Sequence, residues 1–340
     1  MDRLSQIYRI VSISVAYLVF GFANHSQASI VSFGASGNTF TIDFADIGSA
    51  GNAADTTGSP AGSGDVNYGY AISRYEISEA MITRYNASFG NANNLAISTS
   101  NRGPDRPATN VSWNEAARFV NWLNTSTGGF AAYKFTGSGV NANIAMWTPS
   151  DTLDYDATNP FRSIRANYVL PTIDEWYKAA FFDPVTQTYN KYANGGNTKP
   201  TMVGSGTGAN TAVYHRTYPG NADEPAAVNQ AGSANSFGVT GMGGNAWEWL
   251  ETESDGTNNS PSSARRYRGG SWASGDFSLS SASNGSFDLP TQSLNNVGFR
   301  VVALLANNLP APSPTPEPTS LAIAVVFGGL AFAARRKRQA

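Results

Sequence analysis

The sequence predicts a loop-rich fold that mixes short strands with a few short helices. Glycine is frequent, with 34 copies in 340 residues, and Asn, Ser and Thr are abundant. Helix bundles and parallel sheets need more long aliphatic runs than this chain contains. Seven Trp and fifteen Tyr supply large side chains for a core. We therefore expect aromatic side chains to be buried between irregular segments.

The first expected elements are strands. Residues 30–44 alternate loosely between polar and apolar side chains, as in Thr39-Phe40-Thr41-Ile42. Residues 48–64 are rich in Gly, Ala, Ser and Asp and predict a loop. Residues 68–77 are expected to form a strand that leads into a helix. Ser78 can cap that helix, with Glu79 in its first turn.

Two further helices are marked by their capping residues. Ser112 is followed three residues later by Glu115, which is the spacing of a capping box. Apolar side chains then recur at 116, 119, 120 and 123, on one helix face. Thr172 and Glu175 repeat the capping spacing at the third helix. Residues 137–165 read as a polar, irregular insertion, and the chain from 184 to 302 as loops and short strands.

Both ends of the chain indicate export. Arg3 and Arg9 precede an apolar run over residues 10–23, and Ser26-Gln27-Ala28 ends in the small residues that a signal peptidase reads. Residues 1–28 are therefore predicted to be a signal peptide, with the mature chain beginning at Ser29. The alternative is an uncleaved N-terminal anchor.

The C-terminus has three parts in a fixed order. Pro316-Glu317-Pro318 ends a Pro-rich linker over residues 304–318, an apolar run covers residues 321–334, and four cations follow at 335–338. The apolar run is shorter than the roughly 20 residues that span a bilayer comfortably. The order resembles the PEP-CTERM sorting signal of Gram-negative surface and matrix proteins. The resemblance implies a transient inner-membrane anchor over 319–340 that an exosortase-type enzyme processes; the alternative is an anchor that is never processed.

Composition excludes several classes of site. The chain has no Cys and two His, and His25 leaves with the signal peptide. Disulfides, Cys-His zinc sites, iron–sulfur clusters and cysteine nucleophiles are therefore absent from the mature chain. A Ser-His-Asp triad would have to use His215, whose surroundings do not resemble a nucleophile elbow. The net charge of −2, with 14% charged residues, predicts no nucleic-acid partner.

Six segments in order resemble one family, the formylglycine-generating enzyme or sulfatase-modifying factor domain. They are Arg74-Tyr75-Glu76-Ile77-Ser78, the stretch from Pro107 to Ala116, Leu170 to Trp176, Gly244-Asn245-Ala246-Trp247-Glu248-Trp249, Arg268-Gly269-Gly270-Ser271-Trp272 and Gly298-Phe299-Arg300. The resemblance implies an α+β, C-type-lectin-like fold, loop-rich with little regular secondary structure. We expect this domain to cover residues 68–303, with residues 29–67 as a strand and loop segment packed on it.

The motifs themselves predict structural roles. Trp247 and Trp249 alternate with Glu248, so the two indoles can share one face while the carboxylate points away. Arg268 and Arg300 can each clamp a carboxylate or backbone carbonyls. The glycines at 243 and 244 allow close backbone approach.

The chain departs from the family where its chemistry resides. The resemblance implies two copper-binding cysteines, whose places fall here on Ser274 and Leu279. Two other places that often hold Cys are Val120 and Val301. Copper(I) needs soft sulfur ligands, so we expect no copper and no catalytic residue of the family's kind.

Calcium is the cofactor that the resemblance still allows, in a structural role. The matching positions of one site are Asn245, Ala246 and Glu248, and those of another are Asn210, Thr211 and Asp223. Such oxygen ligands suit Ca²⁺. An acidic run over residues 151–156 could also bind calcium, although it lacks EF-hand spacing and reads more simply as a solvated insertion.

Two functional hypotheses follow. The first is an exported, non-catalytic module at the cell surface, in the outer envelope or in an extracellular matrix, which binds a glycan or protein ligand. The alternative is an oxidase of the formylglycine-generating type, acting on a protein substrate with re-assigned active-site residues. The missing thiol pair favours the first hypothesis.

Overall fold

The computed structural model describes residues 29–215 and 224–304. The predicted signal peptide, the linker beyond Leu304, the C-terminal tail and Asp223 lie outside the described residues. Within the described part, no helix combines the length and the apolar character that crossing a bilayer requires.

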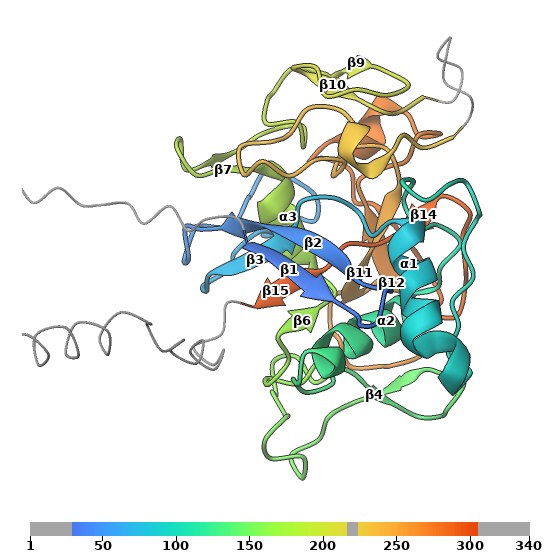
Figure 1. Cartoon of the computed structure of the whole chain (residues 1–340). Coiled ribbons are helices and arrows are strands. Elements are labelled where there is room, and N and C mark those ends of the chain that lie inside the picture. Colours follow the sequence, from blue (N-terminus) through green and yellow to red (C-terminus); the bar gives the residue numbers. More distant parts are fainter. Residues whose placement is uncertain (1–28, 216–223, 305–340) are drawn as a thin grey trace, which may run out of the picture.

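A five-stranded antiparallel sheet joins the two ends of the described chain (Figure 1). Its strands, in spatial order, are β1 (Ser29–Phe33), β2 (Phe40–Ile47), β3 (Tyr70–Ser73), β15 (Val302–Leu304) and β6 (Tyr168–Val169). Strands expected over 30–44 and 68–77 are therefore confirmed. Because β2 pairs with β3 through Phe44 to Ile47, the N-terminal segment belongs to the same sheet as the C-terminal strand β15.

A second sheet of four strands carries the tryptophan motif. Its order is β13 (Ser286–Asp288), β12 (Arg265–Arg268), β11 (Trp247–Glu253) and β14 (Val297–Gly298). Three two-stranded pairs complete the strands: β4 (Lys134–Phe135) with β5 (Ile144–Ala145), β7 (Phe182–Asp183) with β8 (Thr188–Tyr189), and β9 (Thr201–Met202) with β10 (Thr211–Ala212). Figure 1 shows β9 and β10 at the end of the molecule farthest from β4.

The three predicted helices are present, with the predicted caps. They are α1 (Glu79–Tyr85), α2 (Trp113–Ser126) and α3 (Ile173–Phe181). Ser78 caps α1, and both Ser112 and Thr172 form complete capping boxes with a glutamate three residues on. Irregular helical turns over Asn86–Gly90 and Asn91–Asn93 continue α1.

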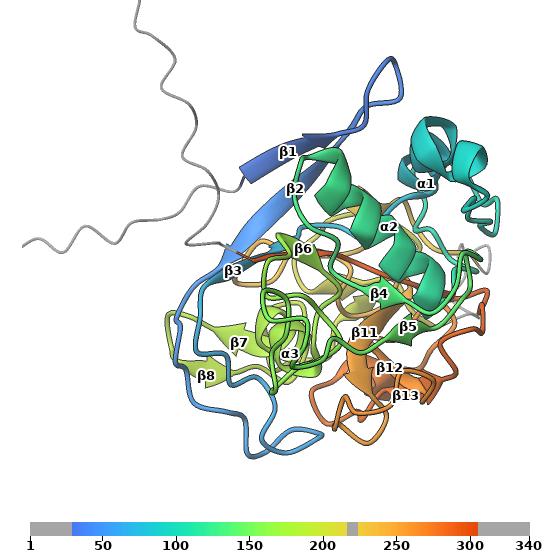
Figure 2. The same ribbon diagram turned by 90° about the horizontal axis from the view of Figure 1, so that it is seen from below.

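Aromatic contacts fix α2 against the five-stranded sheet. Phe40 of β2 lies 6.1 Å from Phe119 and 5.8 Å from Trp122, measured between ring centroids. Figure 2 shows α2 alongside the sheet strands β1, β2 and β6. Residues 137–165 are irregular, as predicted, but Ile144 and Phe161 anchor them in this core because both are fully buried.

The side chains of Trp247, Glu248 and Trp249 alternate between the two faces of β11, as predicted. Trp247 and Trp249 both contact Tyr267 of β12, at centroid distances of 5.4 and 5.1 Å, so the two indoles share one face of β11. Glu248 points the other way, toward Trp176 of α3 and Arg300. Through Glu248, the four-stranded sheet therefore contacts α3 and Arg300, which precedes strand β15.

Candidate functional site

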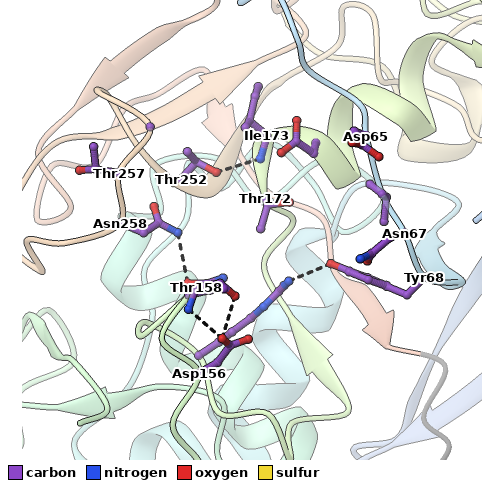
Figure 3. Close-up of a pocket in the computed structure, with 15 residues that line it drawn as sticks. Asp65, Asn67, Tyr68, Asp156, Thr158, Thr172, Ile173, Thr252, Thr257 and Asn258 are labelled. Carbon is purple, nitrogen blue, oxygen red and sulfur yellow. Dashed lines mark hydrogen bonds between the residues drawn. The ribbon is translucent and has the colours of Figure 1, made fainter. Parts of the chain in front are cut away.

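A polar cleft of about 400 Å³ opens beside the start of α3 (Figure 3). Four segments meet there: residues 65–68, residues 156–162, the first residues of α3, and the turn that follows β11. Each segment contributes only a few consecutive residues, so the cleft depends on how the chain between the segments folds. The result is a cavity of ordinary ligand-site size with convergent polar groups.

Arg162 forms one wall of the cleft and is held by two glutamates. Its guanidinium lies 3.0 Å from Glu175 Oε1 and 3.6 Å from Glu251 Oε1. Burial alone would lower the pKa of Arg162, but the charges of Glu175 and Glu251 raise it well above its usual value. Arg162 is therefore a fixed cation whose charge the protein has already compensated.

Tyr68 presents its ring at the mouth of the cleft. Its hydroxyl donates to Glu175 Oε1 at 2.7 Å and accepts from Arg162 at 3.1 Å. Burial and the Glu175 charge raise the pKa of Tyr68, so this hydroxyl stays protonated. The residue nevertheless remains 39% exposed, which leaves an aromatic ring in a fixed orientation against solvent.

Two Asx turns shape the rim. Asp156 Oδ1 accepts from the backbone N–H and the hydroxyl of Thr158, at 2.8 and 2.7 Å. Asp255 makes the same pair of bonds with Thr257, which lines the opposite rim. Asn258, just beyond, donates to Asn159 Oδ1 at 3.2 Å and so bridges the two rims.

The open carboxylates make the cleft acidic. Asp65, Asp156 and Asp174 line it, whereas Arg162 is the one cation among the described residues that line it and is already paired with glutamates. Asp174 accepts from the backbone of Gly64 at 2.9 Å. Burial raises the pKa of Asp174, and the charges of Glu175 and Asp65 raise it further. Asp65 and Asp174 therefore repel one another at the cleft.

Ser274 and Leu279, the positions at which the resemblance placed cysteines, do not line the cleft and are packed against neighbouring residues. Ser274 Oγ accepts from the backbone N–H of Ser271 at 2.9 Å and lies 3.2 Å from the Ser271 hydroxyl. Leu279 is 1% exposed and packs in an apolar cluster. Both positions flank Gly270, whose φ of 80° and close neighbours leave no room for a side chain. A hydroxyl and an aliphatic chain are not the soft sulfur ligands that copper(I) needs.

His215 lies next to Ser274. Its backbone N–H donates to the Ser274 carbonyl at 2.9 Å, and its φ of 67° is left-handed. The single histidine of the described residues thus helps to shape the backbone around Ser274.

The first group of calcium candidates is engaged by protein groups. Both Glu248 oxygens accept from the Arg300 guanidinium, each at 2.6 Å, and Oε2 also accepts from Trp176 at 2.6 Å. Asn245 donates to Glu76 at 3.0 and 3.1 Å and accepts from Ala226. Beside a guanidinium with no free carboxylate oxygen, Glu248 does not fit a calcium ion in this conformation.

Ala246 belongs to the same cluster, and Glu76 is its unusual member. The Ala246 backbone N–H donates to Glu76 Oε1 at 3.3 Å. Burial, together with the charge of Glu248, raises the pKa of Glu76 to about 8, against the opposing effect of Arg300. Arg300 therefore lies near two buried carboxyl groups, those of Glu248 and Glu76. The raised pKa means that Glu76 holds a proton at neutral pH.

The second calcium group lies on a different surface. Asn210 Oδ1 accepts from Asn194 at 2.5 Å, and the Thr211 hydroxyl donates to the Gly208 carbonyl at 2.6 Å. Asp223 is outside the described residues. Over residues 29–215 and 224–304, no group of three or more His, Cys, Asp and Glu side chains suits a metal. Calcium binding stays a prediction for this group.

The acidic run over 151–156 has protein partners. Asp151 pairs with Lys134 at 2.8 Å, and Asp154 pairs with Arg165 at 2.7 Å. Its third member, Asp156, lines the cleft. Two aspartates of the run therefore form ion pairs, and the third lines the cleft. The sequence-based interpretation of the run as a single unit did not predict this difference.

Comparisons with known proteins agree with the fold. Residues 38–305 match the family model of the sulfatase-modifying factor enzyme 1-like domain. Variable protein 1 of Treponema denticola has 19% identity and a TM-score of 0.54, covering 81% of this chain and 99% of its own. The crystal structure of CarF has 20% identity and a TM-score of 0.53, covering 78% and 99%. A comparison with curated proteins finds no match.

These two structural likenesses show the fold alone, and the predicted loop-rich α+β fold is confirmed. The family match spans most of the described residues and includes every motif on which the resemblance was based. The chain therefore belongs to the family of the sulfatase-modifying factor enzyme 1-like domain.

Proposed function

We propose that this protein is an exported, non-catalytic binding module of its family, displayed at the cell surface or in an extracellular matrix. One observation carries the proposal. The family's cysteine places hold Ser274, whose hydroxyl bonds to Ser271, and Leu279, which is buried in an apolar cluster. Neither residue can form a thiolate, and the sequence contains no cysteine.

The polar cleft supports binding as the remaining activity. It has the volume of a small-ligand or glycan site, an oriented aromatic ring at Tyr68, and polar side chains from four segments. The network that fixes Arg162 and Tyr68 holds this arrangement before any ligand arrives. Pre-organisation of this kind lowers the entropic cost of binding.

A binding array tests the cleft directly. We would compare the purified full-length protein with a Thr257→Trp variant, in which an exposed rim residue fills the cleft. Thr186→Trp is the matched control, since Thr186 is also an exposed threonine but does not line the cleft. The proposal expects wild type and control to bind the same glycan or protein, and Thr257→Trp to lose it. Equal binding by all three would place the ligand elsewhere.

Export has its own test. The Pro-Glu-Pro, apolar and basic order predicts that cell-surface material lacks everything after about Pro316, and the N-terminal features predict a start at Ser29. Intact-mass analysis of the surface fraction measures both ends at once. Material that still carries the Arg-rich end would show that the tail is a plain anchor.

A further inference from the structure

We propose that the cleft selects a glycan that carries free amino groups. This inference rests on the proposed function, because it names the ligand class of the same cleft. It is carried by three features that meet in one cavity: carboxylates with oxygens free of hydrogen bonds from the described residues, a buried hydroxyl donor and a fixed aromatic ring.

The carboxylates set the charge of the ligand. Asp65 is exposed and makes no hydrogen bond to the described residues, and Asp174 uses only Oδ1, toward Gly64. Asp156 likewise uses only Oδ1, toward Thr158. Arg162 is paired with Glu175 and Glu251, and Lys178 attracts Asp65 from the core side. Asp156 and Asp174 form no ion pair within the described residues, so an ammonium group of a ligand can pair with them. A ligand with sulfate or uronic acid groups would be repelled.

The hydroxyl-bearing lining indicates a sugar. Thr252 is 5% exposed, and its oxygen accepts from the Ile173 backbone N–H at 2.9 Å. The hydroxyl hydrogen of Thr252 has no acceptor among the described residues, so a buried donor lines the cleft unused. Asn258, 8% exposed, uses one amide hydrogen toward Asn159 and retains the other. Ligand hydroxyls can satisfy both donors.

The ring of Tyr68 indicates how a chain of sugars would lie. Tyr68, Asp156 and Arg162 also line an adjoining hollow of about 260 Å³, whose other wall includes Ile164 and Leu304. Tyr68 therefore stands at the junction of a polar hollow and a more apolar one. A sugar ring has a C–H face and hydroxyl edges, so it can pack on Tyr68 while its edges meet the polar side. Two joined hollows suit more than one sugar.

A lysine-rich peptide would satisfy fewer of these groups. Its ammonium could pair with Asp65 or Asp174, and its stem could cover Tyr68. The donors of Thr252 and Asn258 would then lose water without gaining an acceptor, which is costly for buried groups. A polyhydroxylated scaffold with ammonium groups meets both requirements.

Titration calorimetry with four tetramers tests the inference on the purified full-length protein. They are a β-1,4-linked glucosamine tetramer, its fully N-acetylated counterpart, a uronic acid tetramer and a lysine tetrapeptide, at mildly acidic pH where the amines are charged. We expect the glucosamine tetramer to bind about tenfold more tightly than the acetylated one, and the difference to shrink in high salt.

Variants locate the effect. Asp65→Asn with Asp156→Asn should remove most of the preference for the free amine, and Tyr68→Ala should weaken binding of both neutral and amino sugars. Asp183→Asn is the matched control, because Asp183 also accepts a backbone N–H two residues on but does not line the cleft. Thermal melts of each variant confirm that it is folded.

Each outcome is decisive. Equal binding of the amino and acetylated tetramers, unchanged in the aspartate variant, would overturn the inference while leaving a glycan-binding function in place. Tighter binding of the lysine peptide would replace the sugar with a cationic protein segment. Binding of the uronic acid tetramer, or of no tetramer, would overturn the inference; only formylglycine formation would overturn the non-catalytic function as well.

Discussion

Arg300 in the core and Arg162 in the cleft each lie beside two buried glutamates, but they differ in their exposure to solvent. Arg300 with Glu248 and Glu76 forms a closed network, whereas Arg162 with Glu175 and Glu251 forms a network that is open to the cleft. Arg300 bonds to Glu248 and to the carbonyls of Ser73 and Thr240, and its side chain is fully buried. Arg162 bonds to Glu175 and Tyr68, and its side chain remains 12% exposed at a cavity. The same chemical group thus joins distant segments in one place and orients a binding surface in the other.

The largest expected effect is in the closed network. Arg300→Met would leave Glu248 buried without a counter-ion, at a cost of about 3–5 kcal/mol in the free energy of unfolding. Urea denaturation measures this cost. Adding Glu248→Leu should recover part of the loss, since it removes the uncompensated charge. A cost below about 1 kcal/mol would mean that the ion pair is not the clamp described here.

The same experiment addresses calcium. Glu248→Gln should destabilise the protein equally in chelator and in millimolar calcium, because its oxygens bond to Arg300 and Trp176. A loss of stability that appears only with calcium present would instead support the calcium site expected from the sequence.

Glu76 gives the closed network a pH dependence. Its folded-state pKa is raised to about 8, so the folded protein holds a proton that the unfolded chain releases above about pH 4.5. Stability contributed by this group should fall as pH rises from about 4.5 to about 8, by up to about 1.4 kcal/mol per unit. Denaturation at several pH values should show a shallower decline in Glu76→Gln. Parallel curves for the two proteins would contradict the raised pKa.

The open network should respond differently. Arg162→Met is expected to cost about 2 kcal/mol, less than Arg300→Met, because both glutamates keep other hydrogen-bond donors. Tyr68 still donates to Glu175, and Tyr133 and Asn159 still donate to Glu251. It should also abolish ligand binding, since Tyr68 loses one of its two anchors. Arg300→Met protein that remains folded should bind normally. Loss of binding in both variants would show that ligand binding does not depend specifically on the network around Arg162.

The smallest effect concerns the cap beside the cleft. Thr172→Ala removes the hydroxyl that accepts from the Glu175 backbone N–H and should cost about 1 kcal/mol, whereas Thr172→Ser should retain the cap. A melt series on the two variants distinguishes them. If both variants lose equal stability, the contribution of Thr172 is packing of its methyl group rather than capping.

Features encoded within a few residues were predictable. The caps at Ser78, Ser112 and Thr172 depend on a side chain and a backbone group three residues away, and all three form as predicted. The opposed faces of Trp247 and Glu248 follow from strand alternation alone. The strands of residues 30–44 and the loop of 48–64 were likewise evident.

The cleft was not predictable in the same way. Asp65, Arg162 and Asn258 come from segments far apart in the chain, and irregular loops bring them together without a periodic signal. One local clue existed. Asp-x-Thr recurs at 55–57, 156–158 and 255–257, each forms an Asx turn, and two of the three supply the rims of the cleft. The partner of Glu248 was also unpredictable, because its sequence motif does not show that Arg300 pairs with its carboxylate in the fold.

The central claim is that family chemistry has been lost at Ser274 and Leu279. The most direct test incubates the purified protein with a Cys-containing sulfatase peptide, with and without copper, and follows the peptide by mass spectrometry. We expect the cysteine to remain unchanged in both conditions, as in buffer alone, because neither Ser274 nor Leu279 can supply a thiolate. Conversion of that cysteine to formylglycine above the buffer rate would contradict the loss of this chemistry and establish an oxidase with re-assigned residues.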